Sequence, residues 1–153
     1  MSKQGRDEPT EREVLGDTDL FFFFLRGGRC ESQANSVIRA AAEGRLSLRT
    51  SSEVYDDAIS AIRGHGNPLS LAHSFVSDMR SLPHLALPTS AEIAEEALRL
   101  YQAHGGRRKL SYFDAFHVAT AKRYMLTLLT SDRYIVENAS RLEVKVSDLA
   151  DWG

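Results

Sequence analysis

The sequence predicts an α/β protein, a three-layer α/β/α sandwich whose central sheet is mostly parallel. Short apolar stretches of strand length alternate with segments of helical periodicity along the whole chain. This alternation is the order expected when helices cover both faces of a parallel sheet. No internal repeat, linker or low-complexity tract interrupts it. We therefore expect residues 1–11 to form a flexible polar tail and residues 12–153 to form a single domain.

The expected strands are short and apolar. Val14 and Leu15 form the centre of the first, alternation over residues 46–48 marks the second, and residues 126–130 form a buried strand by length and composition. Strands are expected at residues 12–16, 46–48, 84–87, 126–130 and 142–146.

The expected helices carry apolar or small residues three or four positions apart and are bounded by turn signals. The phenylalanine-rich run of residues 20–25 stops at Gly27 and Gly28, and Pro83 ends a later helix. Further helices are expected at residues 32–43, 50–63, 69–82, 89–104, 112–125 and 132–139.

Bulk composition excludes several classes of protein. The net charge is -2, from 19 basic and 21 acidic side chains, so any nucleic-acid contact must come from a local basic patch. With Cys30 as the one cysteine, neither an intramolecular disulfide nor a paired-cysteine zinc site can form. The first fifteen residues lack the apolar core of a signal peptide, and residues 20–25 are too few to span a bilayer. We expect a cytoplasmic protein.

Four acidic residues stand where an apolar stretch gives way to a turn or a helix start: Asp17, Glu53, Asp114 and Asp132. In an open parallel sheet, ligands bind outside the carboxyl ends of the strands. Carboxylates that share such an edge oppose one another's ionisation, and a divalent cation relieves that repulsion. Oxygen-only ligands suit Mg²⁺ or Mn²⁺. The pattern therefore favours a metal-dependent hydrolase that acts on phosphate esters.

Each of these acids also has a structural interpretation. Asp114 stands three residues after Ser111, and Glu53 stands three after Thr50, as in a capping box. Asp132 has the position of a simple helix N-cap. By position alone, Asp114 begins the helix that leads into the strand at 126–130, which would place it at the opposite end of the sheet unless that helix start bends over the site.

One segment carries a resemblance to a known family. Residues 113–121 read FDAFHVATA, and residues 128–132 read LLTSD. Together with Asp17-Thr18-Asp19 and Ser52-Glu53, this helix and strand end resemble the PIN-domain nucleases, in particular the VapC-type toxins of toxin–antitoxin systems. The resemblance covers about residues 12–150. It implies an endoribonuclease that hydrolyses RNA phosphodiester bonds.

The resemblance also implies a site and partners. Asp17 and Asp114 would be central ligands of Mg²⁺ or Mn²⁺, with Glu53 and Asp132 completing the catalytic metal site directly or through water. Thr18 and Thr130 would orient these ligands, and Asp19 stands where the family usually has Asn or a small polar residue. An antitoxin chain and a second copy of the toxin are the implied protein partners.

Two further features have both a structural and a functional interpretation. Five basic residues flank the acidic ones in sequence, either as solvated loops or as contacts to the RNA backbone: Arg26, Arg29, Arg107, Arg108 and Lys109. The four phenylalanines at 21–24 cannot all face inward on one helix, so some are expected at a surface where the antitoxin would bind. His117, one turn after Asp114, is expected to be a packed or capping residue because carboxylate-rich Mg²⁺ sites seldom use imidazole.

Two alternatives compete with the nuclease. Asp17-Thr18-Asp19 matches the Asp-x-Asp opening of haloacid-dehalogenase-like phosphatases, but Phe21 stands where that motif needs Thr or Val. A non-catalytic module that binds RNA or a protein is the other alternative. Four intact acidic residues argue against it, because a binding protein has no reason to keep charges that repel one another.

Overall fold

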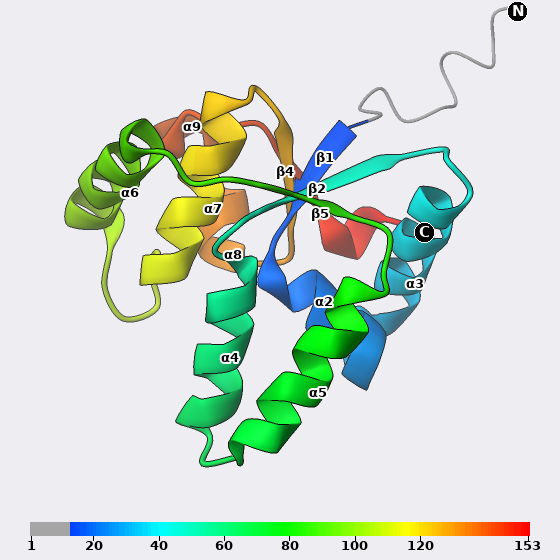
Figure 1. Cartoon of the computed structure of the whole chain (residues 1–153). Coiled ribbons are helices and arrows are strands. Elements are labelled where there is room, and N and C mark those ends of the chain that lie inside the picture. Colours follow the sequence, from blue (N-terminus) through cyan, green and yellow to red (C-terminus); the bar gives the residue numbers. More distant parts are fainter. Residues whose placement is uncertain (1–12) are drawn as a thin grey trace, which may run out of the picture.

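The computed structural model describes residues 13–153, and the tail expected at residues 1–11 lies outside that range. Within it, five strands form one sheet in the order β3-β2-β1-β4-β5, and every neighbouring pair is parallel (Figure 1). The strands are β1 (Glu13–Gly16), β2 (Ser47–Ser51), β3 (Leu85–Leu87), β4 (Thr127–Thr130) and β5 (Val146–Asp148). The predicted fold class, an α/β sandwich with a parallel central sheet, is confirmed.

Helices cover both faces of this sheet, which is why β1 and β4 are apolar on both sides. Leu15 and Leu128 pack against α6 and α7, whereas Val14 and Leu129 pack against α2 and α3. The helices are α2 (Thr18–Arg26), α3 (Glu31–Ala42), α4 (Val54–Gly64), α5 (Leu69–Arg80), α6 (Ala91–His104), α7 (Tyr112–Arg123), α8 (Arg133–Glu137), α9 (Ala139–Leu142) and the 3-10 turn η1 (Leu149–Asp151).

A third apolar cluster lies outside these two layers. Helices α4 and α5 lie side by side as a hairpin that projects from the carboxyl edge of the sheet (Figure 1). Their core is formed by Val54, Ala58, Phe75 and Met79, and α2 contributes Phe21 to it. Phe21 is fully buried, whereas the next three phenylalanines are partly exposed. This agrees with the expectation that the four rings cannot all face inward.

Two sequence-based boundaries were wrong in ways that matter below. Strand β2 runs to Ser51, and α4 begins only at Val54, so residues 50 and 51 belong to the strand and not to a helix. The last strand is β5 (Val146–Asp148), because residues 139–142 form α9 and Glu143 takes the left-handed conformation that ends it. None of the helices described between residues 13 and 153 is long and apolar enough to cross a membrane.

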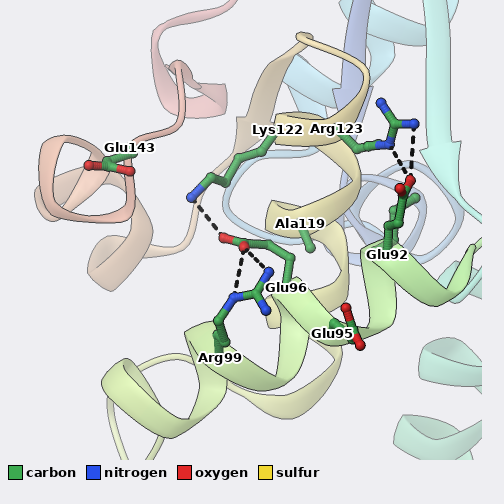
Figure 2. Close-up of a pocket in the computed structure, with 9 residues that line it drawn as sticks. Glu92, Glu95, Glu96, Arg99, Ala119, Lys122, Arg123 and Glu143 are labelled. Carbon is green, nitrogen blue, oxygen red and sulfur yellow. Dashed lines mark hydrogen bonds and ion pairs between the residues drawn. The ribbon is translucent and has the colours of Figure 1, made fainter.

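Ion pairs tie α6 to α7 along a groove of about 610 Å³ (Figure 2). Lys122 of α7 donates to Glu96 Oε2 of α6 at 3.0 Å and to the carbonyl oxygen of Leu142 at 2.9 Å. Arg123 pairs with Glu92 at 3.1 Å in a far more exposed position. Lys122 therefore joins three helices, α6, α7 and α9, through one half-buried ammonium group.

We expect Lys122→Met to lower the free energy of unfolding by about 1–3 kcal/mol. It leaves the Leu142 carbonyl without the Lys122 donor and leaves Glu96 with Arg99 as its remaining cation. The matched control is Arg123→Met, which removes a pair whose side chains are 59% and 72% exposed, and we expect a loss below about 1 kcal/mol. Urea denaturation of the two variants measures the difference. Equal losses would contradict the bridging role of Lys122.

Candidate metal centre

Asp17 lies at the point where β1 ends and α2 begins. It is the N-cap residue of α2, but its side chain makes no capping hydrogen bond. Instead, the hydroxyl of Thr130, at the end of the neighbouring strand β4, donates to Asp17 Oδ2 at 2.5 Å. Asp17 Oδ1 is buried and has no hydrogen-bond partner among the described residues. A buried carboxylate oxygen without a donor is costly unless a cation satisfies it.

The surroundings of Asp17 oppose its negative charge. Burial raises its pKa well above the usual value, and the charges of Asp19 and Asp114 raise the pKa further. The hydrogen bond from Thr130 and the charge of His117 act in the opposite direction without reversing the shift. A divalent cation would supply the missing compensation, because opposite charge favours the ionised form.

A second group of potential ligands adjoins Asp17. Asp57 on the first turn of α4, Asp114 on the first turn of α7 and His117 each offer one ligand atom, and these atoms all lie within 4.8 Å of one another. Thr18, the residue after Asp17, donates to Asp57 Oδ2 at 2.5 Å. A hydrogen bond therefore links the Asp57 carboxylate to the residue that follows Asp17 at the end of β1.

Asp114 reaches this edge because α7 runs antiparallel to β4, into which it leads (Figure 1). The start of α7 consequently lies at the carboxyl ends of the strands, and the predicted difficulty of placing Asp114 there does not arise. Burial raises the pKa of Asp114 to about 6, with contributions from Asp132 and Asp57, against lowering by His117 and the Ser111 hydrogen bond. The backbone N–H of Asp114 donates to Ser111 Oγ at 3.2 Å, so a helix cap and a site residue coincide here.

Asp132 and Asp19 complete the acidic group. Asp132 caps α8, because its Oδ1 accepts the backbone N–H of Ile135 at 3.0 Å, and its charge raises the pKa of both Asp114 and Asp19. Asp19 is largely exposed, yet desolvation, followed by the charges of Asp57 and Asp132, raises its pKa as well. The structure thus brings Asp17, Asp19, Asp114 and Asp132 into mutual electrostatic range.

Glu53 occupies a different position from these acids. It is the N-cap residue of α4 without a side-chain capping bond, and its backbone N–H donates to Ser51 Oγ at 3.2 Å. Its participation in the site therefore stays a prediction, whereas Asp57, one turn further on, lies in the cluster. The sequence reasoning missed Asp57 because it began the helix at Thr50. Given the observed start at Val54, the pair Asp56-Asp57 in the first turn is the signal that points to it.

The basic residues divide into three groups. Arg29 lies at the site, since its guanidinium is 3.4 Å from Ser131 Oγ and its charge lowers the pKa of Asp19. Arg26 instead lies over the rings of Phe22 and Phe75, at 5.9 and 5.3 Å from their centroids. Residues 107–109 form an exposed turn before α7, and within the described part of the chain their side chains make no hydrogen bond or ion pair with the acidic group.

A sequence model of the PIN domain matches residues 15–140, which include all of the acidic residues of the cluster. The chain belongs to the PIN domain family. The predicted family resemblance is confirmed by this match, and the parallel sheet with the acids at its carboxyl edge is the structural counterpart of it. No curated protein matches this PIN domain in a sequence search.

Solved structures show the same fold at low sequence identity. A toxin–antitoxin complex from Klebsiella pneumoniae matches with a TM-score of 0.54 and 19% identity over 89% of this chain and 97% of that chain. VapBC2 from Rickettsia felis, bound to a DNA fragment from its promoter, matches with a TM-score of 0.64 and 13% identity, over 89% of this chain and 98% of that chain. FitAcB from Neisseria gonorrhoeae matches with a TM-score of 0.61 and 16% identity, over 90% of this chain and 99% of that chain.

The residues present fit a divalent cation. The donors are carboxylate oxygens from four elements, one of them buried without a partner, and hard cations such as Mg²⁺ take oxygen ligands. Both Mg²⁺ and Mn²⁺ accept such donors.

The raised pKa of Asp114 makes the stability of the metal-free protein depend on pH. Because the folded-state pKa of about 6 exceeds the usual value of 3.8, the stabilising contribution of the neutral carboxyl group is fully present below about pH 4 and is lost as the pH rises through 6. Asp114→Asn cannot ionise, so we expect it to raise the free energy of unfolding at pH 7.5 by about 1–3 kcal/mol. Urea denaturation in the presence of a chelator measures this.

The matched control is Glu95→Gln, an exposed carboxylate on α6, for which we expect a change within about 0.5 kcal/mol. The stabilisation by Asp114→Asn should largely disappear at pH 4, where Asp114 of the folded wild type is neutral. A variant that is less stable than the wild type at pH 7.5 would contradict the assigned electrostatic cost.

Proposed function

We propose that this PIN domain is a divalent-metal-dependent endoribonuclease that hydrolyses RNA phosphodiester bonds. The observation that supports this most directly is the convergence of Asp17, Asp57 and Asp114 at one sheet edge, with a buried Asp17 oxygen that lacks a hydrogen-bond donor. Membership of the PIN domain family supports the reaction class. Mg²⁺ or Mn²⁺ is the proposed cofactor, held by these three acids with Asp132 directly or through water.

A bound Mg²⁺ or Mn²⁺ would activate water and offset the charge that develops on the phosphate. The side chains of the protein orient the groups around it. Thr130 fixes the Asp17 carboxylate through a 2.5 Å hydrogen bond, and Thr18 does the same for Asp57. Arg29, at the rim of the cluster, is placed to contact a backbone phosphate without reading the base.

We further propose that the protein is the toxin of a toxin–antitoxin pair and acts on RNA in the cytoplasm. Its fold matches a structure described as a toxin–antitoxin complex over 89% of its length, and it matches the VapBC2 and FitAcB structures over 89% and 90%. The partly exposed rings of Phe22, Phe23 and Phe24 on α2 offer an apolar surface for an antitoxin chain. A homodimer is the proposed assembly of the toxin.

The experiment that tests the nuclease is RNA cleavage with added Mg²⁺ or Mn²⁺. We expect Asp17→Asn and Asp114→Asn each to lower the cleavage rate by about 100-fold or more, because several kcal/mol of charge stabilisation depend on the bound cation. Addition of a chelator should have the same effect on the wild type. Cleavage that is unchanged in both variants would refute the site, and RNA binding that is insensitive to chelator, without cleavage, would favour a non-catalytic PIN domain.

Asp57 and Glu53 provide a matched comparison within the same experiment. They lie four residues apart, but Asp57 belongs to the cluster, whereas the Glu53 side chain makes no hydrogen bond to the described residues of the cluster. We expect Asp57→Asn to reduce cleavage as strongly as Asp17→Asn, and Glu53→Gln to reduce it far less. A larger loss of cleavage in Glu53→Gln than in Asp57→Asn would show that Glu53, and not Asp57, is the metal ligand from this segment.

Arg29 and Arg26 provide a second matched pair for RNA binding. In an Asp17→Asn background that does not cleave, we expect Arg29→Ala to weaken binding of single-stranded RNA by roughly 3- to 10-fold and to reduce the salt dependence by about one phosphate contact. Arg26→Ala removes a cation that lies over Phe22 and Phe75 and should leave the salt dependence unchanged. Fluorescence anisotropy at several salt concentrations measures both. Equal effects would place the RNA elsewhere.

A further inference from the structure

His117 is completely buried in the middle of α7, and its ring reaches three other elements. Nδ1 lies 2.7 Å from Ser51 Oγ at the end of β2. Nε2 lies 3.2 Å from Asp57 Oδ2 on α4 and 3.1 Å from Thr18 Oγ1 on α2. A buried imidazole with three polar partners on three elements has more than a packing role.

The partners of Nε2 determine where its proton lies. Thr18 Oγ1 is 2.5 Å from Asp57 Oδ2, and a carboxylate oxygen can only accept, so the threonine hydroxyl donates its proton to Asp57. Thr18 Oγ1 then faces His117 as an acceptor, as does Asp57 Oδ2. Nε2 therefore carries a hydrogen and donates it toward both oxygens.

The second ring nitrogen is also engaged. Ser51 Oγ accepts the backbone N–H of Glu53 at 3.2 Å and lies 2.7 Å from Nδ1. A neutral His117 accepts the Ser51 hydroxyl proton at Nδ1, and a charged His117 donates to the same oxygen. In both cases the nitrogen has a partner, so neither nitrogen offers a free lone pair to a cation.

We infer that His117 is a positioning residue that holds Asp57 toward the cation and is not itself a ligand. Among the described residues, the hydrogen bonds of the Asp57 side chain all end on Oδ2, which accepts from Thr18 Oγ1 and His117 Nε2. The other oxygen of Asp57 is thereby left to face the cation. This inference rests on the proposed metal site, and its test does not require RNA cleavage.

Two amide substitutions separate the roles of the two ring nitrogens of His117. His117→Gln places its amide nitrogen near the position of Nε2 and keeps a donor for Asp57, whereas His117→Asn reaches only the position of Nδ1 and keeps only the partner Ser51. We expect His117→Gln to bind Mn²⁺ within about threefold of the wild type, and His117→Asn to bind it about 10-fold or more weakly. Isothermal titration calorimetry measures both, and equal melting temperatures show that the two variants are equally folded.

A second measurement reports on the ring directly. In protein labelled with ¹⁵N at histidine, the Nε2 signal of His117 should keep the chemical shift of a protonated nitrogen when Mg²⁺ saturates the site. A loss of this proton on Mg²⁺ addition, or a Gln variant that binds Mn²⁺ as weakly as the Asn variant, would show that the imidazole is a ligand and would overturn the inference. Wild-type affinity in the Asn variant would overturn it too.

The outcomes separate this inference from the nuclease proposal. If the wild type does not cleave RNA but His117→Asn alone weakens Mn²⁺ binding, the nuclease proposal fails and the positioning role stands. If the wild type cleaves RNA and both amide variants bind Mn²⁺ equally well, the nuclease proposal stands and the positioning role fails.

Discussion

Repulsion between carboxylates that share one edge of the sheet is the constraint on which the arrangement of this molecule depends. Burial, followed by the charges of neighbouring carboxylates, raises the pKa of Asp17, Asp19 and Asp114, so in the absence of a cation the ionised form of each is disfavoured. The polar groups around them reduce this cost only in part. The Thr130 hydroxyl donates a hydrogen bond to Asp17, and the Ser111 hydroxyl accepts the backbone N–H of Asp114 at the start of α7. The charge of Arg29 lowers the pKa of Asp19. A fold that keeps such a group of charges is poised to bind a cation.

The sheet accounts for most of what could be predicted from sequence. The strands at the centre are apolar on both faces, so their existence and their parallel order follow from composition and alternation with helices. Asp17 and Asp132 could be predicted from their places at strand ends, because the end of a buried strand is marked by a sharp change to polar residues. Asp114 was recognised through the motif at residues 113–121, while its place at the same edge follows from the antiparallel run of α7 against β4.

The residues that sequence reasoning missed or misjudged depend on local boundaries and on tertiary contacts. A four-residue shift in the start of α4, from residue 50 to Val54, separates Glu53 from Asp57, and helix ends are the least certain part of any sequence pattern. His117 was correctly expected to be buried, but its contacts with Ser51, Thr18 and Asp57 join segments up to 99 residues apart. No local pattern contains that information. The final strand was misplaced for a similar reason, since the left-handed residue Glu143 has no strong sequence signature.

The separate core of the α4–α5 hairpin gives the site an additional property. Asp57 is carried by this hairpin, whose apolar cluster is distinct from the two that flank the sheet, whereas Asp17 and Asp114 are carried by the body of the domain. A cation held between the two parts, as proposed, would contribute to the free energy with which the hairpin docks, and docking would contribute equally to cation affinity, since linkage is reciprocal. Hairpin packing, at Met79 for example, would thus be thermodynamically coupled to the proposed metal centre. The hairpin would then behave like a second subunit within one chain, with the cation as the ligand that completes the interface between the two parts.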